Sequence, residues 1–367
     1  MVDPRLKKLA ETLVNYSVEI QPDDWVLVTA HVIAEPLTNE VVRAVLDAGG
    51  HPLVIMSSDE LQEITFKHSS KEQLEFVPPV LKTIYQDADA LISLRAASNT
   101  RALSGVDPEK QRIQQQARRE LMEIYMQRAA EGDLRWTLTQ YPCPAYAQEA
   151  DMSLSEYADF VFSATYTDRD DPVAEWERIH AEQQRIVDWL EGKKQVTVKS
   201  PNADLTLSIE GRTFINSDGK NNMPSGEIFT GPVEDSANGW VEFTYPAIRR
   251  GREVTGVRLE FEDGKVVKAK ADKNEAYLIS QLDSDEGARY LGEFAIGTNY
   301  GIQQFTKSIL YDEKIGGSFH MAVGAGYPET GSVNKSSIHW DFICDIKEDS
   351  EILVDGELLY KDGEFQI

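Results

Sequence analysis

A histidine and a carboxylate near the end of the chain have the spacing that brings two side chains together on a β-strand. His339, Trp340 and Asp341 lie within an apolar run, residues 337–343. This run predicts a strand, and residues i and i+2 of a strand point to the same face. We therefore expect His339 and Asp341 to converge, with Trp340 directed the other way. An imidazole beside a carboxylate holds a metal ion or orients a catalytic histidine.

Further groups of the same kind lie upstream. His320 is another of the six histidines in the chain, and carboxylates occur at Glu227, Glu293 and Glu313. Borderline divalent cations accept both imidazole nitrogen and carboxylate oxygen. Glu293 also lies in an apolar stretch, residues 290–295, where an isolated carboxylate would be costly to bury. These residues predict a metal-binding or catalytic site in the last part of the chain.

Other common site chemistries find little support. The turn after the first predicted strand, residues 30–35, contains no glycine, so a dinucleotide phosphate could not approach its backbone closely. The chain has no Gly-x-Ser-x-Gly motif for a nucleophilic serine. Cys143 lies between two prolines with no activating base in evidence, and neither it nor Cys344 belongs to a Cys-x-x-Cys pair.

The first half of the chain alternates between strand and helix patterns. Short apolar runs predict strands at residues 25–30, 52–56, 90–94, 135–138 and 160–163. Amphipathic patterns predict helices at residues 36–48 and 107–130. Such alternation is typical of a doubly wound parallel sheet covered by helices.

The second half of the chain has a different pattern of polar and apolar residues. Residues 172–191 predict a long helix that bridges two domains. Beyond it, residues 195–199 and 204–208 alternate as half-exposed strands do, and an Asp-Gly turn at 263–264 predicts a hairpin over 256–270. The expected fold class is α/β. A doubly wound parallel-sheet domain, residues 1–192, precedes a β-rich α+β domain, residues 193–367, that carries the metal site.

Charge and hydropathy narrow the range of partners. The 367 residues include 62 acidic and 37 basic side chains, a formal net charge of -25. Nucleic acid and anionic membranes would be repelled by this charge, so neither is expected as a partner. Residues 3–17 predict an amphipathic helix rather than a signal peptide, and no run approaches the roughly 20 apolar residues of a membrane span. A cytoplasmic location is expected.

Several separate motifs, in order, give the chain a resemblance to a known family. It resembles the thermophilic metallo-aminopeptidases of the aminopeptidase T and aminopeptidase S type, over nearly the whole length. The matching segments are residues 25–28, 47–50, 135–136, 141–142, 147–153, 222–227, 291–293, 311–313, 320–324, Tyr327 and 339–341.

The resemblance implies an exopeptidase that removes N-terminal residues from short peptides with two divalent ions (zinc, cobalt, manganese or magnesium). The implied metal ligands are Glu227, Glu293, Glu313, His320, His339 and Asp341. Glu293 would bridge the ions, and Tyr327 would hydrogen-bond the developing oxyanion as a catalytic residue. The family also implies a homodimer, with the first domain serving dimerisation and substrate shaping. One departure from the family pattern is the interval of seven positions between Glu313 and His320.

Two alternatives remain open at this point. His320, His339 and Asp341 alone would form the facial triad of a mononuclear non-haem iron enzyme, such as a ring-cleaving dioxygenase of the hydroxypyridine type. Such an enzyme has no need of Glu227 and Glu293, whose presence favours the peptidase. The other alternative is a peptide-binding protein that has lost its metals, and the intact set of ligands disfavours it.

Overall fold

The computed structural model describes residues 3–249 and 251–367, which pack into two compact units. The first contains the chain up to Glu175 together with Gly219–Pro224, and the second contains Trp176–Asp218 and Ser225–Ile367. The division falls near the start of helix α10 (Pro172–Leu190), whereas the sequence placed it at residue 192. The physical reason is that Ile186 and Leu190 of this helix belong to the apolar core of the second unit.

The first unit is built on a parallel sheet, as predicted. Its strands are β1 (Trp25–His31), β2 (His51–Ser57), β3 (Ala90–Arg95), β4 (Arg135–Gln140) and β8 (Asn222–Met223). Their order is β2-β1-β3-β4-β8, and every pairing is parallel. The α/β class expected for this part of the chain is therefore confirmed.

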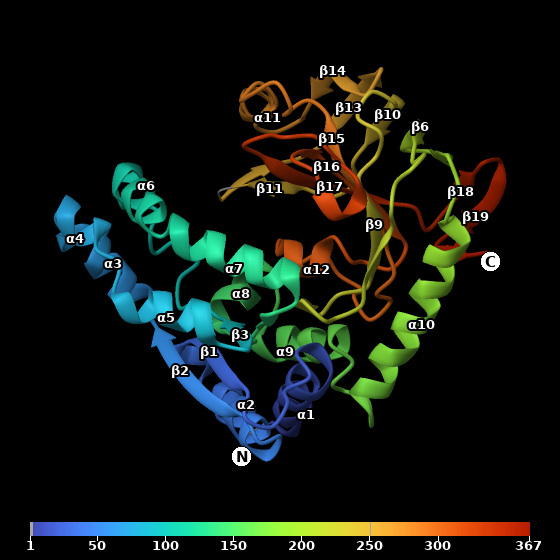
Figure 1. Ribbon diagram of the computed structural model, residues 1–367. Helices are drawn as coiled ribbons and strands as arrows, with labels where there is room; N and C mark the ends of the chain where they lie inside the picture. The colour runs from blue at the N-terminus through green and yellow to red at the C-terminus, as the bar shows by residue number, and fades with distance from the viewer. Residues whose placement is uncertain (1–2, 250) are drawn as a thin grey trace. The chain divides into compact units, whose positions relative to one another are not determined.

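Helices cover both faces of this sheet (Figure 1). Leu27 and Leu91 pack on one face with Ile84 and Tyr125, which belong to α5 and α7, and α1 and α2 lie on the other. The helices are α1 (Pro4–Thr12), a π-helical turn (Leu13–Ser17), a 3-10 turn (Val32–Ala34), α2 (Glu35–Asp47), α3 (Asp59–His68), α4 (Lys71–Glu75), α5 (Pro79–Asp87), α6 (Pro108–Ala117), α7 (Arg119–Glu131), α8 (Pro144–Glu149) and α9 (Leu154–Ala164). None of the described helices, in either unit, has the length and apolar composition needed to cross a bilayer.

Two predictions of secondary structure in this unit are wrong. The apolar run 160–163 lies in helix α9 and not in a strand, because Ser153 begins the helix with a capping box and the buried residues Tyr157, Phe160, Val161 and Ala164 recur at helical spacing. The helix predicted over 107–130 is two helices, since Arg118 between α6 and α7 departs from helical geometry, with φ −89° and ψ 6°.

The second unit contains two larger antiparallel sheets and a small hairpin, which confirms its predicted β-rich character (Figure 1). The eight-stranded sheet has the order β14-β13-β10-β6-β5-β18-β19-β20. Its strands are β5 (Gln195–Ser200), β6 (Ala203–Ser208), β10 (Asn238–Glu242), β13 (Arg258–Glu262), β14 (Lys265–Lys270), β18 (Glu351–Val354), β19 (Glu357–Lys361) and β20 (Glu364–Phe365). The hairpin predicted around Asp263-Gly264 joins β13 to β14, and both turn residues adopt the positive φ that such a turn requires.

The five-stranded sheet has the order β17-β16-β15-β9-β7. Its strands are β7 (Ile215–Ser217), β9 (Glu227–Thr230), β15 (Leu291–Gly297), β16 (Ser318–Gly324) and β17 (His339–Asp345). The remaining elements of the unit are strands β11 (Ala247–Arg249) and β12 (Arg252–Val254), helices α11 (Glu275–Leu282) and α12 (Ile309–Asp312), and a 3-10 turn (Pro328–Thr330).

The two larger sheets share one apolar core. Val198 and Leu205 of the eight-stranded sheet lie in the same buried cluster as Phe294 and Phe342 of the five-stranded sheet. Phe243, which follows β10, packs its ring 5.2 Å from the ring of Phe342 in β17. Burial of apolar surface between the sheets is thus the main force that fixes the five-stranded sheet in place.

The shared core generates a stability prediction for Phe243, which is 3% exposed. Phe243→Ala should lower the free energy of unfolding by about 3–5 kcal/mol, because the lost ring leaves a cavity between the sheets. Denaturant titration followed by circular dichroism measures this. Val333→Ala, at a side chain that is 73% exposed, is the matched control and should have almost no effect. Equal stability losses in the two variants would contradict a core shared by the sheets.

Candidate metal centre

Strand periodicity separates two kinds of side chain on the five-stranded sheet. Phe294, Phe319, Met321, Trp340 and Phe342 point into the shared core. The residues between them point to the opposite face, which we call the donor face. It carries Glu227 from β9, Glu293 from β15, His320 from β16, and His339 and Asp341 from β17. The predicted convergence of His339 and Asp341, with Trp340 directed into the core, is confirmed.

Each donor residue has a glycine or alanine opposite it on at least one neighbouring strand. Glu227 pairs with Gly297, His320 with Ala295, and His339 with Gly324. Ala322 pairs with Glu293 on one side and with Asp341 on the other. Directly opposed side chains have their Cβ atoms only about 4.5–5.5 Å apart, so large neighbours would fill this face. Glycine and alanine leave the space into which the longer donor side chains extend.

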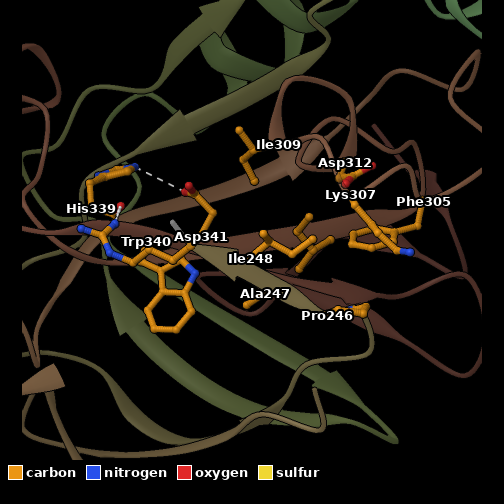
Figure 2. Close-up of a pocket in the computed structure, with 12 residues that line it drawn as sticks. Pro246, Ala247, Ile248, Phe305, Lys307, Ile309, Asp312, His339, Trp340 and Asp341 are labelled. Carbon is orange, nitrogen blue, oxygen red and sulfur yellow. Dashed lines mark hydrogen bonds and ion pairs between the residues drawn. The ribbon is translucent and has the colours of Figure 1, made fainter. Parts of the chain in front are cut away.

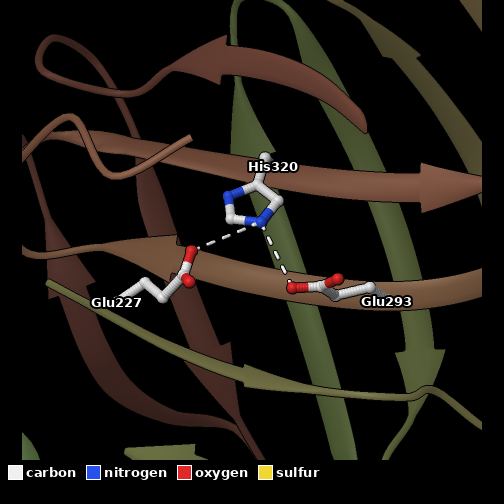
Figure 3. Close-up of side chains that lie close together, drawn as sticks. All are labelled: Glu227, Glu293 and His320. Atoms are coloured by element: carbon white, nitrogen blue, oxygen red, sulfur yellow. Dashed lines mark hydrogen bonds and ion pairs between the residues drawn. The ribbon is translucent and has the colours of Figure 1, made fainter. Parts of the chain in front are cut away.

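Glu293 is at the centre of the cluster. Its Oε1 lies 3.3 Å from His320 Nε2, and its Oε2 lies 3.2 Å from His339 Nε2. Glu227 Oε2 lies 3.6 Å from His320 Nε2, so this nitrogen lies between the carboxylates of Glu227 and Glu293 (Figure 3). Each oxygen of Glu293 thus faces a different imidazole, so one carboxylate belongs to two groups of potential ligands.

The orientation of His339 is fixed by a hydrogen bond from its other nitrogen. His339 Nδ1–H donates to the carbonyl oxygen of Ala325 at 2.7 Å. Nε2 is thereby left toward Glu293 and toward Asp341 Oδ1, which lies 3.3 Å away. A histidine held in this way presents the lone pair of the free nitrogen to a metal ion.

Glu313 reaches the cluster from outside the sheet, in spite of its longer interval from His320. It follows helix α12, and one of its carboxylate oxygens lies within 4.8 Å of ligand atoms of His320 and Asp341. The connecting segment packs against β15, because Gly297 has no Cβ: a Cβ there would lie 2.3 Å from the carbonyl oxygen of Ile315. The close approach of the backbone at Ile315 to β15 therefore keeps Glu313 near the other donors, although seven positions separate it from His320.

Lys314 is a member of the cluster that sequence reasoning missed. Its side chain is fully buried, its Nζ lies 3.6 Å from Glu227 Oε1, and it forms an ion pair with Glu313 Oε1. The only sequence signal was its position directly after Glu313, and a lysine beside a glutamate is usually a solvated surface residue.

Tyr327 lies beside the donor residues on the connection between β16 and β17. Its ring packs edge-on against His339, with centroids 5.1 Å apart, and against Phe229, with centroids 5.5 Å apart. The connection is held by two carboxylates: Asp285 accepts hydrogen bonds from Ser337, and Glu234 accepts one from the backbone of Val333. The residue is 39% exposed, so part of it is accessible to a bound molecule.

Burial and mutual attraction shift the pKa values of the metal-free cluster. Burial disfavours a charged histidine, but the contacts with Glu293 and Glu227 outweigh it and raise the pKa of His320 to about 9. In the same way, contacts with Asp341 and Glu293 raise the pKa of His339 to about 11. The two histidines in turn outweigh the effect of burial on Glu293 and lower its pKa to about 2. Without an ion, both imidazoles are therefore protonated on both nitrogens and positively charged at neutral pH.

A pocket of about 370 Å³ opens beside His339 and Asp341. Figure 2 shows Ile248 and Ile309 in its middle, with Phe305 and Lys307 at the end away from His339. Arg249 donates to the carbonyl oxygen of His339 at 2.9 Å and so ties the pocket to the first residue of β17. The pocket residues come from segments far apart in the sequence, and no pattern in the sequence indicated them.

The chain's other histidines and its cysteines serve elsewhere. His31 accepts a hydrogen bond from the backbone of Ile33 at the end of β1, and His180 on α10 pairs with Asp218 at 2.7 Å. Cys143 is buried in an apolar cluster of the first unit, and Cys344 is buried in the core of the second.

The donor set suits a divalent cation. Three groups within it have ligand atoms that all lie within 4.8 Å of one another: Glu227, Glu293 and His320; Glu293, His339 and Asp341; and Glu313, His320 and Asp341. Glu227 Oε2 is buried and has no hydrogen-bond partner among the described residues. This oxygen lies 3.6 Å from His320 Nε2, beyond hydrogen-bond distance, so a bound cation would give it a close partner. Mixed carboxylate and imidazole ligands fit zinc, cobalt and manganese.

Comparisons with known proteins agree with this chemistry. The family model described as thermophilic metalloprotease (M29) matches residues 2–365. Aminopeptidase 2 of Geobacillus stearothermophilus is 28% identical over 399 aligned residues, which cover 98% of this chain and 95% of that protein. Aminopeptidase T of Thermus thermophilus is 26% identical over 398, with the same shares of each chain.

The solved structure of wild-type AmpT from Thermus thermophilus matches with a TM-score of 0.86 and 24% sequence identity, over 99% of each chain, and so shows the same fold. These matches confirm the resemblance carried by the sequence motifs. The protein is a metal-dependent aminopeptidase, a hydrolase. The chain belongs to the thermophilic metalloprotease family M29.

Proposed function

We propose that the protein removes N-terminal residues from short peptides with the help of two divalent ions bound side by side on the donor face. The observation that carries the proposal is the position of Glu293, whose two oxygens each face a different histidine. A carboxylate so placed is suited to bridge two ions. The proposed ligands are Glu227, Glu293, Glu313, His320, His339 and Asp341.

The groups of the cluster suggest how the ligands divide. Glu227, Glu293 and His320 would hold one ion, and Glu293, His339 and Asp341 the other. Glu313 lies near His320 and Asp341 and would serve as a further ligand. Zinc, cobalt, manganese and magnesium are the candidate ions, and the two imidazoles favour the first three over magnesium.

The chain's own groups would orient the substrate and stabilise charge. When bound, two such ions supply a water of lowered pKa and polarise a carbonyl oxygen. Burial, together with the charges of Glu293 and Asp341, raises the pKa of Tyr327 above its usual value, so its hydroxyl keeps its proton. A protonated phenol at this position is suited to donate a hydrogen bond to the oxyanion of the tetrahedral intermediate.

A mononuclear iron oxygenase is a weaker interpretation of the same cluster. It would use His320, His339 and one carboxylate. Glu227 and Glu293 are only 5% exposed, and both would then be buried without a role. Family membership also favours the hydrolase.

The resemblance adds a homodimer whose active sites face an internal cavity, which would limit substrates to short peptides. The first unit would contribute dimerisation and substrate shaping. The net charge of -25 supports the absence of nucleic acid and membrane partners and agrees with a cytoplasmic location. Analytical ultracentrifugation of the intact chain tests the dimer directly.

The pocket beside His339 and Asp341 would receive the apolar side chain of a substrate residue. Ala247, Ile248 and Ile309 lie in the middle of the pocket, between His339 at one end and Phe305 and Lys307 at the other. Burial raises the pKa of Asp312, deeper in the lining, to about 8, so this carboxyl group is mostly uncharged at neutral pH. An apolar side chain such as leucine would lose less hydration on entering this lining than a charged one.

The shared position of Glu293 predicts unequal losses of metal. The wild type should bind about two ions per chain and hydrolyse aminoacyl-anilides, Glu293→Gln should lose both ions, and Glu227→Gln should keep about one. Metal analysis after dialysis measures this, with circular dichroism as the check on folding. Glu262→Gln, at an exposed position on β13, is the matched control and should keep both ions and full activity. One bound iron with oxygen uptake would contradict the proposal.

The raised pKa values of the histidines predict the pH dependence of metal binding. His320 and His339 are protonated below pKa values of about 9 and about 11, so each ion must displace a proton at neutral pH. Affinity should therefore fall as the pH falls, with release of roughly two protons per chain near neutral pH. Calorimetric titration with zinc in buffers of different ionisation enthalpy counts these protons. Binding without proton release would contradict the raised pKa values of the two imidazoles.

The apolar pocket predicts a change of substrate preference on Ile248→Glu. The added carboxylate should lower kcat/KM for leucyl-anilide by at least about tenfold, and that for glycyl-anilide, which has no side chain to insert, far less. Val267→Glu places the same change at a 48% exposed side chain on β14 and serves as the control. An equal loss for both substrates would remove the pocket from substrate selection.

A further inference from the structure

Lys314 is a fully buried lysine inside a cluster of carboxylates. Its Nζ lies 3.6 Å from Glu227 Oε1 and pairs with Glu313 Oε1. Removing a lysine ammonium from water is expensive, and it persists in a protein interior only when opposite charges surround it. The position therefore requires a specific electrostatic explanation.

The backbone holds Lys314 firmly in this place. Its N–H donates to the carbonyl oxygen of Tyr311 at 3.0 Å, and its own carbonyl oxygen accepts from the N–H of Asn299 at 3.0 Å. Gly316 N–H donates to the carbonyl oxygen of Asn299, also at 3.0 Å. The ammonium is thus delivered to the carboxylates by an anchored segment, and its complete burial keeps it from touching a peptide substrate.

The contacts of Lys314 with the two glutamates are to Oε1 of each. Glu227 turns Oε1 toward Lys314 and Oε2 toward His320, and Oε2 has no hydrogen-bond partner among the described residues. Glu313 likewise uses Oε1 for the lysine. The lysine thus contacts one oxygen of Glu227, while the other oxygen faces His320, a proposed ligand.

A buried positive charge stabilises the carboxylates of the cluster most when no ion is present. Glu227, Glu293, Glu313 and Asp341 bring four carboxylates together, and in the metal-free protein the ammonium of Lys314 faces them together with the imidazoles of His320 and His339. Like charges at these distances repel strongly in a buried site. Two divalent ions would offset the carboxylates by themselves, so the contribution of the lysine is greatest in the metal-free protein.

We propose that Lys314 is a positioning residue that acts as a resident cation, holding Glu227 and Glu313 in their binding positions until metal ions arrive. The inference rests on the proposed two-ion site and deepens it by naming how the empty site is kept assembled. It assigns Lys314 to metal loading and not to the chemical step.

The test compares the metal-free and the metal-loaded protein. Lys314→Met removes the charge and keeps most of the volume. Relative to the wild type in the same state, the melting temperature should fall by roughly 5 °C more in the chelator-treated variant than in the manganese-loaded variant. The difference in melting temperature between the loaded and the metal-free protein should therefore be larger in the variant than in the wild type. Differential scanning calorimetry measures both, and calorimetric titration with manganese should show tighter binding with unchanged stoichiometry.

Two further variants separate electrostatics from packing. Ile315→Ala, at the neighbouring residue that is 1% exposed, should lower both melting temperatures by the same amount. Lys314→Arg keeps the positive charge, so its difference in melting temperature between the loaded and the metal-free protein should be close to that of the wild type. If Lys314→Met does not fold without metal, recovery of folding on adding manganese supports the proposal, and failure to fold with manganese overturns it.

Equal destabilisation of the metal-free and loaded Lys314→Met protein would overturn the role of Lys314 while leaving the two-ion site intact. A wild type that binds no manganese, zinc or cobalt would instead overturn the two-ion site itself. Titration of the wild type therefore distinguishes the two failures.

Discussion

The alternation of side chains along the five-stranded sheet is the constraint on which the rest of the second unit depends. One face of β9, β15, β16 and β17 must be apolar, because it closes the core shared with the eight-stranded sheet. The same period of two then puts Glu227, Glu293, His320, His339 and Asp341 on the other face. A shift of one residue in register would exchange the faces, burying carboxylates in the core.

Room for the donor side chains follows from the residues opposite them. Glycine and alanine at Gly297, Ala295, Ala322 and Gly324 leave the donor face open along the cross-strand rows. Gly297 has a second function, since its missing Cβ lets the segment after α12 approach β15 and deliver Glu313 and Lys314. A cluster assembled from five separate segments therefore depends on a few small residues as much as on the charged ones.

Charge explains why the cluster is both costly and useful. Carboxylates buried this close together raise the pKa values of His320 and His339 and keep a lysine ammonium in the interior. The apolar core beneath the sheet offsets this electrostatic cost through burial of surface on its other face. The arrangement concentrates negative charge on the donor face, beside a pocket lined by Ile248 and Ile309 and next to the partly exposed Tyr327.

Local patterns in the sequence determined the alternating elements of the first unit, the hairpin at Asp263-Gly264, and the convergence of His339 with Asp341, because each depends on spacing along one segment. They failed at α9, where an apolar run without its capping residue resembles a strand. Only the tertiary structure decided that Lys314 is buried among carboxylates and that Ile248, Phe305 and Ile309 line one pocket. Those contacts depend on strand register and close backbone approach between distant segments, which no local pattern encodes.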